Sequence, residues 1–299
     1  MIPGYRMYYP FKSHYFTIAN GHLMHYLDEG HGDPIVMVEG IPTWAFYYRY
    51  QEKAVRDEYR AVVPDHIGMG LSQKPQDAYY TYTLKSRIDD LEALLEHTGV
   101  TQDITLVVHD WGGPIGFGYA IRHPERIKRL MILNTSAFHL LPGKDVPLPL
   151  TFFGRTLVGA YLTRSLNAFA RGAALFATSS DLPAAIADAY TAPYDSWDNR
   201  IGTIRFVQDI PTKPSHPAYP VLSEIQEAVE GGLFANVPAL ICWGMQDFVF
   251  DADYLAKWEA ALPEAEVHRF PDAGHYVLED ATKPIADLFI DWLERTPID

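Results

Sequence analysis

A strand-to-helix corner in the first half of the chain constrains its fold most. The apolar run Ile104–Val108 is typical of a strand buried on both faces. The small-residue segment Gly112–Ala120 is typical of a closely packed helix. Asp110 occupies the corner between them, where such a turn presents a nucleophile in enzymes, more often a serine. A carboxylate there can displace a leaving group from a saturated carbon and leave an alkyl ester on the protein.

Apolar strands and amphipathic helices alternate on both sides of this corner. Residues 14–19 and 22–28 predict a hairpin joined through Asn20-Gly21. Leucines at helical spacing predict a helix over 82–97. The alternation predicts an α/β fold with a doubly wound, mostly parallel sheet. The other predicted strands are 35–38, 61–63, 127–133, 239–243 and 266–270.

The alternation lapses from residue 136 to residue 219. This stretch is rich in Pro, Ala, Phe and Tyr, with helix-like segments but no convincing strand. We interpret 136–219 as a helical cap inserted after the sixth strand, and 1–135 with 220–299 as the core domain. Such an insert lies over the carboxyl ends of the strands, where α/β sheets bind ligands.

Charge and hydropathy exclude several partners. The net charge of −14 makes phosphate backbones and anionic membrane surfaces unfavourable, so no nucleic-acid partner is expected. No apolar run approaches the roughly 20 residues needed to span a bilayer, and the N-terminal segment lacks the apolar stretch of a secretory signal. The single cysteine, Cys242, lies in an apolar run and is interpreted as a buried small hydrophobe. These features predict a cytoplasmic protein.

Two later loops supply the groups that a nucleophile at Asp110 needs. Asp247 follows the strand ending at Trp243, and His275 follows the last strand. The chain order nucleophile, acid, base matches the order expected for a corner of this kind. His275 would accept a proton from a water that attacks the ester, and Asp247 would hold the imidazole tautomer. Each residue alone also has a structural interpretation, Asp110 as a helix N-cap and His275 as a loop residue.

Over nearly its full length the chain resembles the haloalkane dehalogenase family of α/β-hydrolases. The segments that carry the resemblance are Pro42-Thr43-Trp44, residues 64–72, His109-Asp110-Trp111-Gly112-Gly113 and Asp272-Ala273-Gly274-His275. Residues 206–211 and 243–248 resemble the branch that also contains the β-lactone decarboxylases of olefin biosynthesis. The resemblance implies an eight-stranded, mostly parallel sheet. It also implies a reaction that uses no cofactor and no metal.

The resemblance also implies roles for residues beside the nucleophile. Trp111 corresponds to the halide-stabilising residue, whose indole N–H suits a weakly hydrated anion. The backbone N–H groups of Trp111 and Ile41 are expected to form an oxyanion hole. Glu39 stands where the family usually has histidine, and Ile41 where it usually has the asparagine that helps to hold halide. Trp197 of the cap is the candidate for a replacement halide donor.

The sequence leaves the effect of Glu39 open. Near Asp110, its charge would raise the pKa of one of the two carboxyls or repel an anionic leaving group. Paired with a nearby arginine or N–H group, it would only support the loop.

Several functions are compatible with the sequence. The first is hydrolytic dehalogenation of a small apolar substrate through an ester of Asp110. The second is β-lactone decarboxylation, which the loss of the asparagine favours, and the remaining two are epoxide hydrolysis and ligand binding without catalysis. Epoxide hydrolysis would need a cap tyrosine as acid, with Tyr161, Tyr190, Tyr194 and Tyr219 as candidates. The oligomeric state is open, and an apolar pocket is expected from Phe152, Phe153, Phe169, Phe176 and Trp197.

Overall fold

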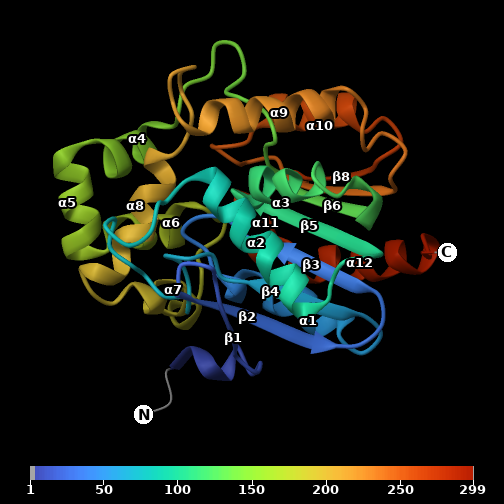
Figure 1. Ribbon diagram of the computed structural model, residues 1–299, viewed down its shortest axis with the longest axis horizontal. Helices are drawn as coiled ribbons and strands as arrows, with labels where there is room; N and C mark the ends of the chain where they lie inside the picture. Colours follow the sequence, from blue (N-terminus) through green and yellow to red (C-terminus); the bar gives the residue numbers. More distant parts are fainter. Residues whose placement is uncertain (1–3, 299) are drawn as a thin grey trace.

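The computed structural model describes residues 4–298 and has an eight-stranded sheet at its centre (Figure 1). The strand order is β1-β2-β4-β3-β5-β6-β7-β8; β2 runs antiparallel to its two neighbours and every other pair is parallel. The strands are β1 (His14–Thr17), β2 (Leu23–Gly30), β3 (Pro34–Val38), β4 (Arg60–Pro64), β5 (Ile104–Asp110), β6 (Ile127–Thr135), β7 (Ala239–Gly244) and β8 (Glu266–Phe270).

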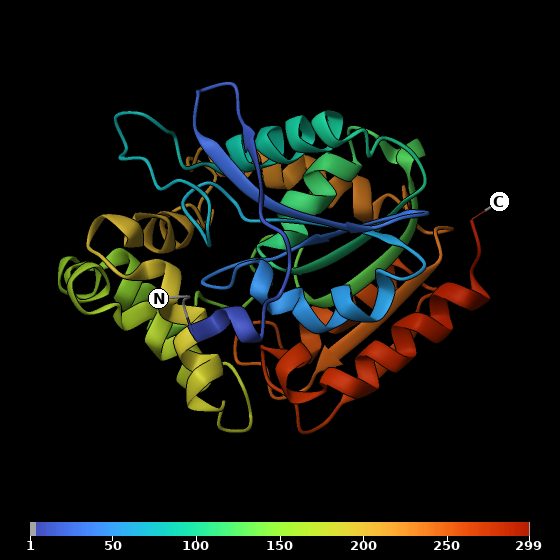
Figure 2. The same ribbon diagram turned by 90° about the horizontal axis from the view of Figure 1, so that it is seen from below.

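The apolar runs form central strands because both faces of the sheet are covered by helices (Figure 2). Alternate residues of one strand enter opposite cores, as Val36 and Met37 of β3 do. One face packs against α2 (Leu84–Thr98), α3 (Gly112–Ala120), α9 (Ala218–Glu230) and α10 (Ala252–Ala261). The other packs against α1 (Arg49–Val55), α11 (Val277–Asp280) and α12 (Thr282–Arg295).

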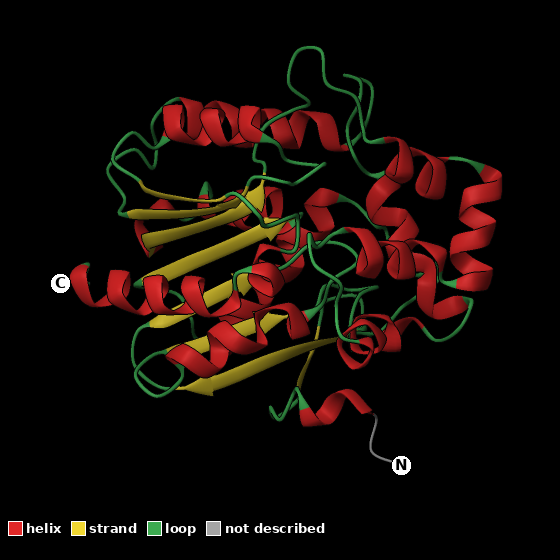
Figure 3. Cartoon of the chain, turned by 180° about the vertical axis from the view of Figure 1, so that it is seen from behind, coloured by secondary structure: helices red, strands yellow, loops and turns green. Residues whose placement is uncertain are grey.

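Five further helices lie beyond the carboxyl ends of the parallel strands (Figure 1). Figure 3 shows this region as helix and loop without strands. The helices follow β6 in the chain, and we refer to them below as the cap. They are α4 (Leu148–Arg155), α5 (Leu157–Leu166), α6 (Ala168–Phe176), α7 (Ala184–Thr191) and α8 (Ile201–Gln208).

Short 3-10 segments complete the secondary structure. They are η1 (Gly4–Met7), η2 (Ala45–Tyr48), η3 (Pro124–Arg126), η4 (Ala192–Tyr194) and η5 (Asp198–Arg200). Across residues 4–298, no helix is both long enough and apolar enough to cross a membrane.

Candidate active site

Asp110 ends β5 at the corner that leads into α3. Its φ angle of 50° lies in the left-handed region, which a non-glycine residue adopts only when its surroundings hold it there. A side chain on Gly40 would collide with the Asp110 carboxylate, and one on Gly112 would collide with the backbone of Val38. Glycine at these two positions therefore lets the loop after β3 approach the corner closely.

The structure brings Asp247 and His275 to this corner from two other strand ends. His275 donates from Nδ1 to Oδ2 of Asp247 over 2.8 Å, and its Nε2 lies 3.4 Å from Oδ2 of Asp110. The backbone N–H of Val249 donates to Oδ1 of Asp247 over 2.7 Å, which fixes the plane of that carboxylate. All three side chains are buried. The imidazole thus lies between two carboxylates in a buried site.

This arrangement controls the charge of the site. Burial alone would lower the pKa of His275, but Asp247 and Asp110 outweigh it and raise the pKa to about 10. Burial would raise the pKa of Asp110, but the hydrogen bond and charge of His275 and the Ile41 N–H outweigh it and lower the pKa. An ionised carboxylate beside a protonated imidazole is the expected resting state at neutral pH.

The backbone of Ile41 also contacts Asp110 at the corner. The N–H of Ile41 donates to Oδ1 of Asp110 over 2.7 Å, as a member of the expected oxyanion hole could do. The Ile41 side chain carries no donor and lies in an apolar wall. Trp111 follows Asp110 directly and lines the same cavity.

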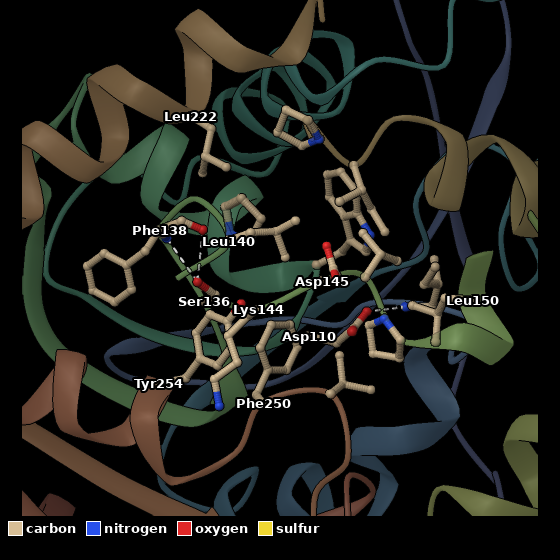
Figure 4. Close-up of a pocket in the computed structure, with 18 of the residues that line it drawn as sticks. Asp110, Ser136, Phe138, Leu140, Lys144, Asp145, Leu150, Leu222, Phe250 and Tyr254 are labelled. Atoms are coloured by element: carbon tan, nitrogen blue, oxygen red, sulfur yellow. Dashed lines mark hydrogen bonds between the residues drawn. The ribbon is translucent and has the colours of Figure 1, made fainter. Parts of the chain in front are cut away.

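Two apolar cavities meet at Asp110, and they share Ile41 and Asp110 in their walls. Figure 4 shows the first cavity, with Asp110 on one side and apolar side chains around it. We call these cavities the first arm and the second arm. The first arm is lined by Trp111, Phe138, Leu140, Leu222, Phe250 and Tyr254, among others. The second is lined by Phe153, Phe169, Gly172, Phe176, His275 and Tyr276, among others.

The aromatic residues expected to line the pocket divide into two groups. Phe153, Phe169 and Phe176 line the second arm. Phe152 and Trp197 line neither arm. The prediction that these two rings supply pocket wall is therefore wrong.

Trp197 also fails as a candidate halide donor. Its side chain is 47% exposed, and its ring packs against Tyr161 and under the guanidinium of Arg164 instead. The sequence around Trp197 does not distinguish a tryptophan that packs on the surface from one that faces the site.

Glu39 is fully buried behind the corner. Neither carboxyl oxygen accepts a hydrogen bond of normal geometry, and no arginine pairs with it among residues 4–298. Burial raises the pKa of Glu39 well above its usual range, and Asp65 and Asp110 raise it further, while the backbone at His66 offsets a part. Burial is thus the main cause of the raised pKa of Glu39, and the charge of Asp110 contributes less.

A buried ion pair near Trp111 is not apparent from the sequence. Arg87 of α2 donates to Asp209, just after α8, over 2.7 Å, and its guanidinium lies 5.2 Å from the centre of the Trp111 ring. The same guanidinium stacks 3.6 Å from the centre of Phe206. No periodicity links Arg87 to Asp209, which is 122 residues away. Residues 4–298 hold no group of three or more side chains placed to ligate a metal ion.

Comparisons with known proteins agree with this geometry. The sequence model described as alpha/beta hydrolase fold matches residues 33–282. A protein of Shewanella oneidensis named cis-3-alkyl-4-alkyloxetan-2-one decarboxylase is 54% identical, over 92% of this chain and 86% of its own. Haloalkane dehalogenase 2 of Mycobacterium bovis is 30% identical over 95% of each chain.

Solved structures support the fold in the same way. A haloalkane dehalogenase from Bradyrhizobium elkani superposes with a TM-score of 0.84 at 22% identity, covering 95% of this chain and 98% of that one. The predicted fold class and the resemblance to this family, including its lactone branch, are thereby confirmed.

Proposed function

We propose that this chain, which belongs to the α/β-hydrolase fold family, converts β-lactones with two alkyl chains into alkenes and carbon dioxide. The observation that carries the proposal is the meeting of two apolar arms at Asp110. An oxetan-2-one substituted on carbons 3 and 4 carries one alkyl chain on each of two neighbouring ring atoms. Two arms that meet at the reacting carboxylate can hold one chain each. The name of the Shewanella relative supports the same ring as substrate.

The chemistry of the corner allows a two-step route without water. Asp110 attacks carbon 4 of the ring, the bond from carbon 4 to the ring oxygen breaks, and a free carboxylate forms on carbon 3. The bond from carbon 3 to this carboxylate then breaks and releases carbon dioxide. Its electron pair forms the double bond between carbons 3 and 4, while the ester oxygen leaves carbon 4 and restores Asp110.

His275 serves this route best as a cation. With its pKa raised to about 10, the imidazolium keeps Asp110 ionised for attack and stabilises the carboxylate that leaves in the second step. As long as the imidazole keeps its proton it cannot accept one from water, and hydrolysis of the ester is disfavoured. Asp247 keeps the ring charged and oriented through the 2.8 Å hydrogen bond.

Hydrolytic dehalogenation is the second candidate. The position of Trp111 next to Asp110, in the wall of the first arm, favours it, since an indole N–H can stabilise a departing halide. The apolar Ile41 side chain weighs against it, because no second side-chain donor stands at that position.

Epoxide hydrolysis and ligand binding without catalysis have less support. Epoxide hydrolysis is disfavoured because Tyr161, Tyr190, Tyr194 and Tyr219 line neither arm. A purely binding role gives no reason for an imidazolium held between two carboxylates.

The test compares two substrates under the same conditions. The protein is incubated in ¹⁸O-labelled water with a cis-3,4-dialkyl oxetan-2-one and, separately, with a 1-bromoalkane of equal length. We expect alkene and carbon dioxide from the lactone, no ¹⁸O-labelled hydroxy acid, and little bromide release. Asp110→Asn, freshly prepared to avoid deamidation, should abolish turnover without changing the melting temperature. Labelled alcohol with bromide, and no alkene, would identify a dehalogenase instead.

A further inference from the structure

The exposed apolar side chains are concentrated on the cap. Of the fifteen large apolar side chains with high exposure among residues 4–298, nine lie between Leu148 and Trp197. Leu157 is 92% exposed, Leu148 83% and Phe176 73%. Isolated exposed apolar residues are normal, but a group of them on one part of a protein indicates an interaction surface.

These residues belong to three consecutive helices that pack on one another. Helix α4 packs against α5, and α5 against α6. Figure 1 shows α4 and α5 at the margin of the molecule farthest from the sheet. We define the outer cap surface as Leu148, Leu157, Val158, Tyr161, Leu175 and Phe176.

The charge of this region is opposite to that of the whole chain. Residues 146–180 contain three arginines and neither Asp nor Glu, although the chain carries a net charge of −14. Arg164 pairs with Asp198, which leaves Arg155 and Arg171 as the cations without a carboxylate partner among residues 4–298. Arg155 donates to the Thr212 hydroxyl and the Ile210 carbonyl, two neutral groups that leave its charge uncompensated. Arg171 is exposed on α6, one helical turn before Leu175. Apolar side chains beside cations match the interface of a bilayer with anionic headgroups.

The second arm connects this surface with Asp110. Phe176 belongs to the outer cap surface and also lines the second arm, together with Gly172 and Ala173 of the same helix. The second arm reaches Asp110 and His275 at its inner end. An apolar molecule in a bilayer could thus enter the site from the surface that touches the bilayer.

We infer that the outer cap surface binds the interface of an anionic lipid bilayer, with the second arm facing the lipid. The overall negative charge argues against such a partner only when it is averaged over the molecule, because screening limits electrostatic attraction to about 10 Å. Residues 146–180 carry only positive formal charges, and the six aspartates of 136–219 lie outside that stretch. The inference does not depend on which reaction Asp110 performs.

Cosedimentation with vesicles tests the inference. The purified protein is mixed with vesicles of phosphatidylcholine alone and with vesicles of phosphatidylcholine and phosphatidylglycerol. We expect binding to the anionic vesicles, weaker binding to the neutral ones, and release by salt. Leu157→Gln combined with Leu175→Gln should reduce the partition coefficient roughly tenfold or more. Arg155→Gln combined with Arg171→Gln should remove most of the preference for anionic lipid.

Leu233→Gln is the matched control. Leu233 is 44% exposed and lies between α9 and β7, toward the amino ends of the parallel strands and away from the cap, so this variant should bind like the parent. Absence of parent binding to either kind of vesicle would overturn the inference. So would equal binding of the Leu157/Leu175 variant and the parent. A parent that elutes as a dimer, with a monomeric Leu157/Leu175 variant, would instead identify an interface between two copies.

Discussion

Glu39 is a fully buried carboxyl group behind the Asp110 corner, and neither of its oxygens accepts a hydrogen bond among residues 4–298. Its pKa is raised by burial first and by Asp65 and Asp110 next, so the folded protein binds the Glu39 proton more tightly than the unfolded chain, which releases it above about pH 4.3. The folded state therefore binds more protons than the unfolded state at neutral pH. Linkage then requires that the Glu39 contribution makes the fold less stable as the pH rises.

Glu39→Gln should consequently stabilise the protein at high pH. The amide has a similar shape and needs no proton, so we expect a melting temperature a few degrees above that of the parent at pH 8. The difference should shrink as the pH falls toward 5, because the unfolded parent then also binds the Glu39 proton part of the time. Thermal unfolding followed by circular dichroism at both values measures this. A difference independent of pH would mean that Glu39 is ionised in the folded protein.

His275 gives a second prediction at this scale, in the pH dependence of activity. A pKa raised to about 10 means that the imidazolium is present below pH 10 and is lost above it. Alkene formation should be nearly constant between pH 7 and pH 9 and fall on approach to pH 10, while the fraction of hydrolysed lactone rises. Asp247→Asn removes one of the two charges that raise the pKa of His275, so the fall in alkene formation should begin at lower pH. A rate that climbs steadily from pH 7 to pH 9 would show that neutral imidazole is the active form.

At the scale of elements, the Arg87–Asp209 pair joins α2 to the end of α8. Both side chains are buried; Arg87 donates from Nη1 to Asp209, and its Nε and Nη2 have no hydrogen-bond partner among residues 4–298. Removal of one partner from a buried pair leaves the other charge unpaired and typically costs about 3–5 kcal/mol. Arg87→Met should therefore lower the free energy of unfolding by about 3 kcal/mol or more. Arg87→Met combined with Asp209→Leu should lower the free energy of unfolding less than Arg87→Met alone. Urea unfolding of the parent, the two single variants and the double variant would measure the coupling. Additive losses would contradict a direct pair.

The sequence predicts those strands and helices whose position is set by the hydrophobic pattern and capping residues of the segment itself. The central strands are continuous apolar runs because helices cover both faces, so β3, β4 and β7 lie within a residue or two of their predicted bounds. The helix predicted over 82–97 is α2, Leu84–Thr98, which begins after the capping hydroxyl of Thr83 and ends before Gly99. Such signals are local, and no distant residue has to be known.

The cap and the surroundings of Asp110 depend on contacts between distant residues, and here the sequence is less informative. Helices α4 to α8 have eight to ten residues each, so two or three turns do not decide which aromatic rings face inward. Phe153 lines the second arm while the adjacent Phe152 does not. The convergence of Asp110, Asp247 and His275 could be predicted because all three follow strand ends at one edge of the sheet. The roles of these three residues remain predictions.

At the scale of the whole molecule, the two arms are built jointly by core and cap, so each can be narrowed separately. Leu140, in the loop after β6, lines the first arm, and Gly172 of α6 lines the second with open space beside its α-carbon. Leu140→Trp and Gly172→Leu should each fill one arm while leaving Asp110, Asp247 and His275 unchanged.

The substrates that test this are two lactone isomers. One has a long chain on carbon 3 and a methyl on carbon 4, and the other has these two groups exchanged. Because attack at carbon 4 fixes the ring relative to Asp110, each long chain should enter one arm only. We expect each variant to lower kcat/KM roughly tenfold or more for one isomer, with opposite preferences in the two variants. Equal losses on both isomers in both variants would mean that the chains do not occupy separate arms, and the forked site would no longer support a substrate with two alkyl chains.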